Sequence, residues 1–260
     1  MPIPEPVSTS LIAKGIEALG GHAVDRGVLA TLAMLKRFGP TLLAFGDVRV
    51  SFAVTLRVRD GDNFVLVRNE HRNEVYTPLG GVVKYNDEGS LHLPSIGFRP
   101  QDSLGTSMRN DLRGWLPSRR LLTLQKWYTH GHQREVSVLA LIREVTEECD
   151  RLRPRLAFAM PTLPQLRFIH VVHEGPGKPP GLTYKQYRRA EVYELDTSHD
   201  ESREFARSLV VAAKAHPDLV LASREEIIRG RSRSGKAIAH NAGWCFQKKR
   251  LPREEAPHPL

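Results

Sequence analysis

The segment that most constrains this chain is residues 136–149, a run without glycine or proline. Its apolar residues recur at the spacing of one face of an α-helix, which predicts a helix with one buried side. Glu144, Glu147 and Glu148 stand at positions i, i+3 and i+4, so such a helix projects their carboxylates from one face. Three converging carboxylates favour a cation such as Mg²⁺ or Mn²⁺, which prefers oxygen ligands. The apolar positions are Leu139, Ile142 and Val145.

Strand and helix patterns alternate around this segment. Residues 51–58 alternate apolar and polar side chains, and the turn at Asp60 and Gly61 leads into a second strand at 64–67, which predicts a hairpin. Ser223 and Glu226 have the spacing of a capping box. The alternation predicts an α/β or α+β fold. Further strands are predicted at 76–84, 165–172 and 190–195, and further helices at 202–215, 223–229 and 236–246.

The chain divides into three parts by composition. We expect a helical extension at 1–46, a main domain at 47–246 with an insertion at about 86–132, and a charged, flexible tail at 247–260. The extension is predicted to hold helices at 10–19 and 25–38, and the insertion a helix at 119–128.

Cysteine content and hydropathy indicate a cytoplasmic protein. The chain has two cysteines, too few for a disulfide framework, and it has neither a long apolar run nor a secretion-signal pattern at MPIPEP. The formal net charge of +9 favours an anionic partner such as a nucleotide or a nucleic acid, although a merely solvated basic surface is an equal alternative. No RNA-binding motif is present, and nothing indicates the oligomeric state.

The glutamates belong to a longer pattern. Glu135 is followed by seven residues and then by the run REVTEE at 143–148, which resembles the second half of the Nudix box. Gly80 and Gly81 follow a predicted strand, as the glycine pair of that family does. The resemblance implies a Nudix-like α/β/α sandwich with a mixed sheet, and a hydrolase that cleaves a phosphoanhydride with Mg²⁺ or Mn²⁺. It implies that Glu144, Glu147 and Glu148 bind the metal, that Arg143 orients them, and that Glu135 is a weaker catalytic candidate.

This box departs from the family's usual form. Glu135 lies 54 positions (135 − 81) after Gly81, so the box is split by the insertion. Thr129 and Asp150 stand where the family has glycine. The split box, Trp127 before the glutamate helix and the run at 225–242 together resemble the SMODS-associated Nudix domains that lie beside cyclic-oligonucleotide synthetases in bacterial anti-phage systems. That resemblance implies a nucleotide-derived signal as the ligand.

Three functions remain open from the sequence. The first is metal-dependent hydrolysis of a nucleotide or nucleoside diphosphate derivative, the second is a nucleotide-binding sensor with weak or no catalysis, and the third is RNA decapping. The ends of the insertion must come together in the box, so we predict that it packs beside the glutamate helix and shapes the substrate site. The candidate substrate-binding residues are Gly80, Gly81, Arg119, Arg120 and Arg188.

Overall fold

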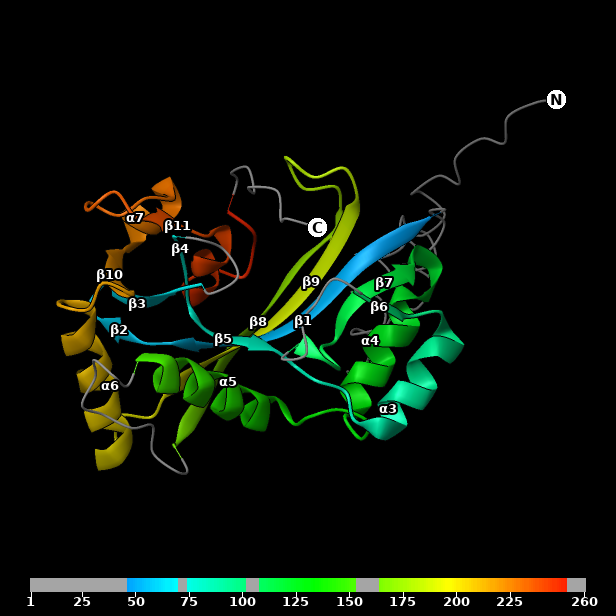
Figure 1. Cartoon of the computed structure of the whole chain (residues 1–260), viewed down its shortest axis with the longest axis horizontal. Coiled ribbons are helices and arrows are strands. Elements are labelled where there is room, and N and C mark those ends of the chain that lie inside the picture. The colour runs from blue at the N-terminus through cyan, green and yellow to red at the C-terminus, as the bar shows by residue number, and fades with distance from the viewer. Residues whose placement is uncertain (1–45, 70–73, 102–107, 153–163, 252–260) are drawn as a thin grey trace, which may run out of the picture. The chain divides into compact units, whose positions relative to one another are not determined.

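The computed structural model describes residues 46–69, 74–101, 108–152 and 164–251. All of them belong to one compact unit, Thr41–Leu260. The helices expected at 10–19 and 25–38 lie outside the described residues, as does most of the expected tail. Strands from both halves of the described chain form two sheets, and helices lie against them (Figure 1).

The larger sheet has six strands and is built around β1 (Asp47–Arg57). One edge of β1 pairs in parallel with β9, and its other edge pairs antiparallel with two strands in succession. β7 pairs with residues 47–51 of β1 and β5 with residues 53–56, so these two strands share one edge and meet near Phe52. The other strands of this sheet are β5 (Leu79–Val82), β6 (Arg99–Pro100), β7 (Arg113–Pro117), β8 (Leu166–Gly177) and β9 (Lys185–Leu195), of which β6 pairs with β7 and β8 with β9.

The smaller sheet has five strands in the order β10-β3-β4-β11, with β2 paired to β3. The hairpin turn lies where the sequence predicts it, and Gly61 there adopts a positive φ of 59°. The first strand of this hairpin is the two-residue β2, whereas most of the predicted strand at 51–58 belongs to β1 of the larger sheet. The single strand expected at 76–84 is instead two strands, because Pro78 separates β4 from β5 and each joins a different sheet. The members are β2 (Arg59–Asp60), β3 (Asn63–Arg68), β4 (Val75–Thr77), β10 (Leu219–Ser223) and β11 (Ala237–Ile238).

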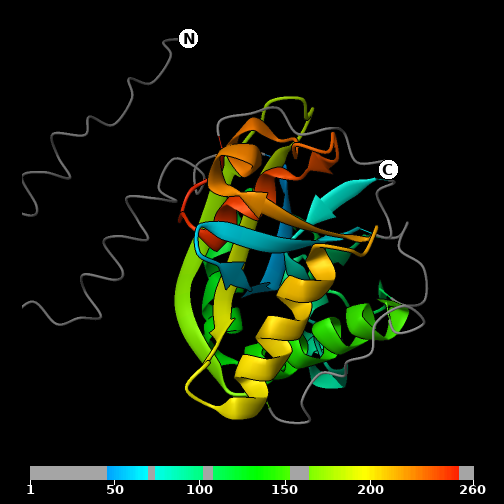
Figure 2. The ribbon, with the colours of Figure 1, turned by 90° about the vertical axis from the view of Figure 1, so that its left-hand side faces the viewer.

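Helices α4 (Leu121–His130) and α5 (Ser137–Leu152) lie on one face of the larger sheet (Figure 1). The Tyr128 ring of α4 stacks on Phe52 of β1 with their centroids 4.4 Å apart, and α5 packs against β5 and β1. The 3₁₀ helix η5 (His240–Cys245) covers part of the opposite face, where Trp244 packs in an apolar cluster with side chains of β8 and β9. Helix α6 (Asp200–Ala213) packs against β10 and β3 (Figure 2).

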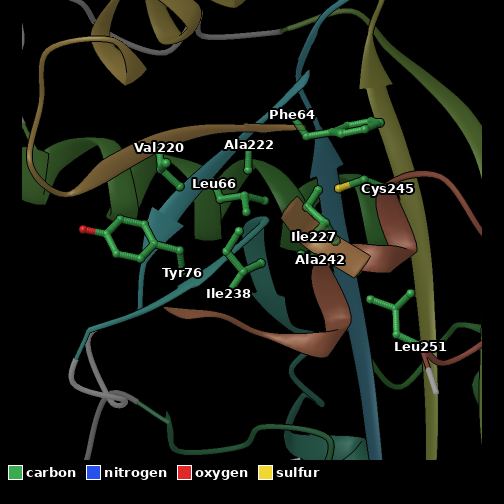
Figure 3. Packing of buried hydrophobic residues seen from close by; sticks show 10 residues of the cluster. All are labelled: Phe64, Leu66, Tyr76, Val220, Ala222, Ile227, Ile238, Ala242, Cys245 and Leu251. Atoms are coloured by element: carbon green, nitrogen blue, oxygen red, sulfur yellow. The ribbon is translucent and has the colours of Figure 1, made fainter. Parts of the chain in front are cut away.

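A second apolar cluster joins the smaller sheet to α7 (Arg224–Arg229) and η5. Figure 3 shows side chains of β3, β10 and β11 gathered beside Ile227 of α7, with Ala242 and Cys245 of η5 next to them, while the Tyr76 ring of β4 extends away from η5. The capping box predicted for Ser223 and Glu226 is present at the start of α7. This cluster fixes η5 between the two sheets.

The fold class was predicted correctly, but several elements were not. Mixed sheets with helices confirm the α+β expectation. The helix predicted at 236–246 is wrong, because this segment forms β11, which pairs with β4, and then the 3₁₀ helix η5. Among the described residues, no helix is long and apolar enough to cross a membrane.

The insertion contributes more than a surface loop. It supplies β6 and β7 to the larger sheet, together with α3 (Asp87–His92), η1 (Leu93–Ile96), η3 (Ser118–Arg120) and α4. Because α4 lies on the same face of the sheet as α5, the insertion packs on the face that carries Glu144, as the sequence predicts.

Candidate active site on helix α5

A glycine pair in β5 lets α5 approach the sheet closely. A Cβ atom on Gly81 would lie 2.0 Å from Oε2 of Glu144, so the glutamate side chain occupies the space that any larger residue would fill. Gly80 has a φ of +121°, and a Cβ there would lie 2.3 Å from the Val54 carbonyl oxygen. The pair therefore serves two purposes, since Gly80 meets a backbone requirement and Gly81 makes room for a carboxylate.

Glu148 enters the same site from the next turn of α5. It is 9% exposed, and its Oε2 accepts a hydrogen bond of 2.9 Å from the Gly80 N–H. Burial, with smaller contributions from the charges of Glu144 and Glu147, raises the pKa of this carboxyl to about 8, and the hydrogen bond from Gly80 and the charge of Arg151 act in the opposite direction. A negative charge at Glu148 is therefore costly in the metal-free protein.

Arg143 links the glutamates of the site. Its guanidinium donates two hydrogen bonds to Glu135, of 2.8 and 2.9 Å, and one of 2.6 Å to Glu144. It also donates to the Val82 carbonyl of β5 at 3.1 Å and reaches Glu147 at 3.5 Å. The contact with Glu147, four residues further along the helix, is the longest of these.

The pKa values of the paired glutamates differ in direction. Burial opposes ionisation of Glu135, but the hydrogen bonds from Arg143 and from the Lys84 N–H outweigh it and lower the pKa. Burial raises the pKa of Glu144, with a further contribution from the charge of Glu147, even though Arg143 acts in the opposite direction. Glu135 is therefore held as an anion, while Glu144 is more easily protonated than an ordinary glutamate.

The three proposed metal ligands differ in exposure. The side chains of Glu144 and Glu148 are 19% and 11% exposed, whereas that of Glu147 is 58% exposed. Among the residues that the structure describes, no three His, Cys, Asp or Glu side chains form a ready metal-binding group. Arg143 donates a hydrogen bond to Glu144, and Glu148 accepts one from the Gly80 N–H and forms a 3.9 Å ion pair with Arg151.

The apolar stripe predicted for α5 is correct at Val145 and wrong at Leu139. Leu139 is 58% exposed, whereas Leu141 and Val145 are fully buried and share their face with Cys149 and Glu148. The buried face of α5 also contains the polar residues Ser137 and Glu148, so the sequence pattern predicted the neighbouring, more hydrophobic face as the buried one. The correct register places Glu148 on the side of the helix that contacts the sheet.

Asp111, just before β7, is a further acidic residue that the sequence reading missed. It is 7% exposed, and burial raises its pKa to about 7, with Arg113 opposing and Glu144 adding to the shift. Its Oδ2 lies 3.8 Å from a guanidinium nitrogen of Arg113. No sequence signal marked it, because it lies inside the insertion, where the pattern showed no strand.

The candidate substrate-binding arginines occupy different surroundings. Arg119 and Arg120 are exposed on η3. Arg188 is buried on β9, where it lies 3.9 Å from Glu174 and 2.6 Å from the Nε2 atom of His240. Arg188 is therefore on the opposite face of the larger sheet from Tyr128 and α4.

Comparison with protein families gives one match to this fold and site. The model of the SMODS-associated NUDIX domain matches residues 47–246. The chain belongs to this family. No curated protein and no solved structure matches it. The Nudix domain is a hydrolase-type or nucleotide-binding module, and Nudix enzymes typically use divalent metals on nucleotide-type substrates.

Proposed function

We propose that this Nudix domain hydrolyses a phosphoanhydride in a nucleotide or nucleoside diphosphate derivative, with a divalent cation held by Glu144, Glu147 and Glu148. The observation that carries the proposal is the seating of Glu144 and Glu148 against Gly81 and Gly80. Two partly desolvated carboxylates are thereby placed next to a strand whose glycines leave room for them. Such a site favours cation binding over a purely structural role.

The donor set suits Mg²⁺ or Mn²⁺. All three candidates are carboxylates, and these metals prefer hard oxygen ligands. Burial and mutual repulsion raise the pKa of Glu148 and of Glu144, so a bound cation would relieve an existing cost. Arg143 now provides part of this compensation to Glu144. The residues therefore fit a metal site, and Glu144, Glu147 and Glu148 are the ones that would form it.

Each residue of the site has a distinct task in this scheme. The metal would supply Lewis-acid polarisation of the phosphate and activation of a water molecule. One of the three ligand glutamates would also take the proton that the attacking water gives up. Arg143 positions Glu144 and Glu147, and the ion pair between Arg143 and Glu135 fixes the guanidinium. Glu135 thus acts through Arg143.

A nucleotide sensor without hydrolysis is the second candidate. One observation favours it: the Nudix box is split by the insertion. In either case we propose a nucleotide-derived signal of bacterial defence as the ligand and the cytoplasm as the location. RNA decapping ranks last, because only the net charge of +9 favours it.

Substitution of Glu148 by glutamine tests the proposal. Purified wild type and Glu148→Gln are incubated with Mg²⁺ or Mn²⁺ and a panel of NTPs, dinucleotides, nucleotide sugars, NAD and cyclic oligonucleotides. We expect metal-dependent product release by wild type and a loss of at least about 10²-fold in the variant, because metal-assisted charge stabilisation supplies several kcal/mol. In thermal melts without metal, the variant should be as stable as wild type or slightly more so, since it removes a costly buried charge.

Two outcomes separate the candidates. Undiminished turnover by Glu148→Gln would reject the catalytic assignment. If wild type shows neither turnover nor a shift of its melting temperature with Mg²⁺, the sensor without a metal is favoured instead.

A further inference from the structure

A row of polar residues crosses the larger sheet on the face opposite Tyr128 and α4. Ser51 of β1 is the register partner of Arg113 on β7 and of Arg188 on β9, and Arg188 is the partner of Glu174 on β8. Register partners in a sheet point to the same side. The Cα atoms of the two arginines are two strand spacings apart, about 10 Å, so their guanidinium groups can reach one ligand between them.

The Arg113 guanidinium has few partners for its five N–H donors. Among the described residues, its contacts are the Met108 sulfur at 3.8 Å and the Asp111 carboxylate at 3.8 Å, both longer than a hydrogen bond to oxygen. The side chain is 24% exposed. Burial lowers the pKa of Arg113, Asp111 opposes the shift, and the positive charge of Arg188 adds to it. An anion between the two arginines would offset both the burial and the repulsion.

The row begins close to the carboxylate helix. Arg113 starts β7, and β7 meets β5 on the shared edge of β1. Asp111 lies at this junction, and Glu144 contributes to the electrostatic surroundings of both Asp111 and Arg113. Backbone hydrogen bonds close this junction, with the Phe52 N–H donating to Leu112 and the Leu112 N–H donating to Val83, so the row and α5 lie near each other on opposite faces of the sheet.

Two aromatic side chains pack together further along β7 from Arg113. Trp115 lies two residues further along β7, on the same side of the strand, and its ring packs edge-on against Tyr184 with centroids 5.2 Å apart. Both side chains are partly exposed. Aromatic faces stack on nucleobases, whereas planar guanidinium groups bind phosphate through paired hydrogen bonds.

We propose that Arg113, Ser51 and Arg188 bind a phosphate group of the nucleotide ligand, with its base beside Trp115 and Tyr184. The inference rests on the proposed function for the class of ligand, but not on hydrolysis. Arg188 shares its charge with Glu174 and His240, so Arg113 is the principal contact and Arg188 supports it.

Binding in the absence of metal tests the proposal. Calorimetric titrations in EDTA use wild type, Arg113→Gln and Arg113→Lys with inorganic pyrophosphate, ADP and adenosine. Arg203→Gln is the matched control, because it removes the same charge from an arginine on α6 that pairs with Asp200. We expect pyrophosphate and ADP to bind wild type and Arg203→Gln equally, and Arg113→Gln at least about 10-fold more weakly. Arg113→Lys should fall between them, because it keeps the charge but loses the planar fork.

The outcomes distinguish this inference from the proposed function. Equal binding by Arg113→Gln and Arg203→Gln, or no binding of pyrophosphate and ADP by wild type, would overturn the inference even if wild type hydrolyses a nucleotide. Arginine-dependent binding without metal-dependent product release would support the inference while rejecting hydrolysis. Thermal melts of Arg113→Gln and Arg113→Lys control for folding, because Arg113 also attracts the buried Asp111 carboxylate, and binding is compared only at temperatures where both variants are folded.

Discussion

Substitution by alanine should have different effects at the two glycines of β5: at Gly81 it should impair function, and at Gly80 it should reduce stability. In Gly81→Ala, the new Cβ would lie 2.0 Å from Glu144 Oε2, while an ordinary contact is at least 3.4 Å, so the carboxylate must move by about 1.4 Å. The backbone of Gly81 does not need a positive φ, and the group that must move is the end of a flexible side chain. The fold should therefore tolerate alanine, whereas the carboxylate cannot keep its position.

The expected size of each effect follows from these contacts. The partly exposed ion pair of Glu144 with Arg143 contributes about 1 kcal/mol at most. Replacing glycine by alanine stabilises the fold by about 0.4–1 kcal/mol, because the unfolded chain then has less conformational entropy, and the two effects nearly cancel. The melting temperature of Gly81→Ala should thus stay within about 4 °C of wild type. A catalytic group misplaced by more than about 1 Å can cost 10²-fold in rate, and turnover should fall by roughly that factor.

Gly80→Ala is the control on the neighbouring residue. Its Cβ would lie 2.3 Å from a backbone oxygen of β1, and alanine at a φ of +121° is strained, so the backbone itself must shift. We expect a loss of stability of about 1–3 kcal/mol or more. Circular dichroism melts with and without Mg²⁺, together with turnover of the nucleotide that the panel identifies, measure both variants. The reasoning fails if Gly81→Ala keeps the turnover and the Mg²⁺-induced stabilisation of wild type, or if it unfolds as Gly80→Ala does.

Three further substitutions test other parts of the structure. Glu174→Gln removes a buried carboxylate whose pKa in the folded protein is lowered from 4.5. In wild type this carboxylate stabilises the fold fully above its unfolded-state pKa, and the stabilisation is lost as the pH falls through its folded-state pKa. The variant's deficit in unfolding free energy, on the order of 3 kcal/mol at pH 7, should shrink below about pH 4.5, and a deficit independent of pH would contradict this. Arg143→Gln should destabilise the protein more than Glu148→Gln but reduce turnover less, since Arg143 positions the ligands; melts and turnover of both variants decide the order. Ser223→Ala should cost about 1 kcal/mol in chemical denaturation with turnover unchanged, because it removes only the α7 cap.

Local patterns predicted the elements whose own residues determine them. The turn of the β2–β3 hairpin, α5 and the capping box of α7 depend on patterns within a few residues, and all three are present. The segment Ala237–Cys245 was misread because its residues suit a helix, while its structure depends on distant partners. Ile238 pairs with Tyr76 of β4, and the Trp244 indole donates to Glu174 of β8. Tertiary contacts overrode the local preference.

The row of polar residues across the larger sheet was not predicted from the sequence, for a related reason. β7 is five residues long and contains both glycine and proline, so nothing within it predicts a strand. It becomes one because the first half of β1 has an unpaired edge once β5 has paired with the second half. Only this pairing brings Arg113 into register with Ser51 and Arg188. Residues from positions 51, 113 and 188 therefore meet through topology, which spacing along the chain does not encode.

The register of α5 bears directly on whether the carboxylates are functional. A surface helix would place Glu148 in solvent, where a glutamate costs little and often pairs with arginine. Here Glu148 lies on the stripe that also buries Val145 and Cys149, and its only hydrogen bond among the described contacts comes from the Gly80 amide. Arg151 lies 3.9 Å away, too far for a strong bond. A leucine or a glutamine there would stabilise the metal-free fold better than a carboxylate whose pKa is raised to about 8. Residues that oppose stability concentrate at functional sites, and a divalent cation would offset the charge of this buried carboxylate.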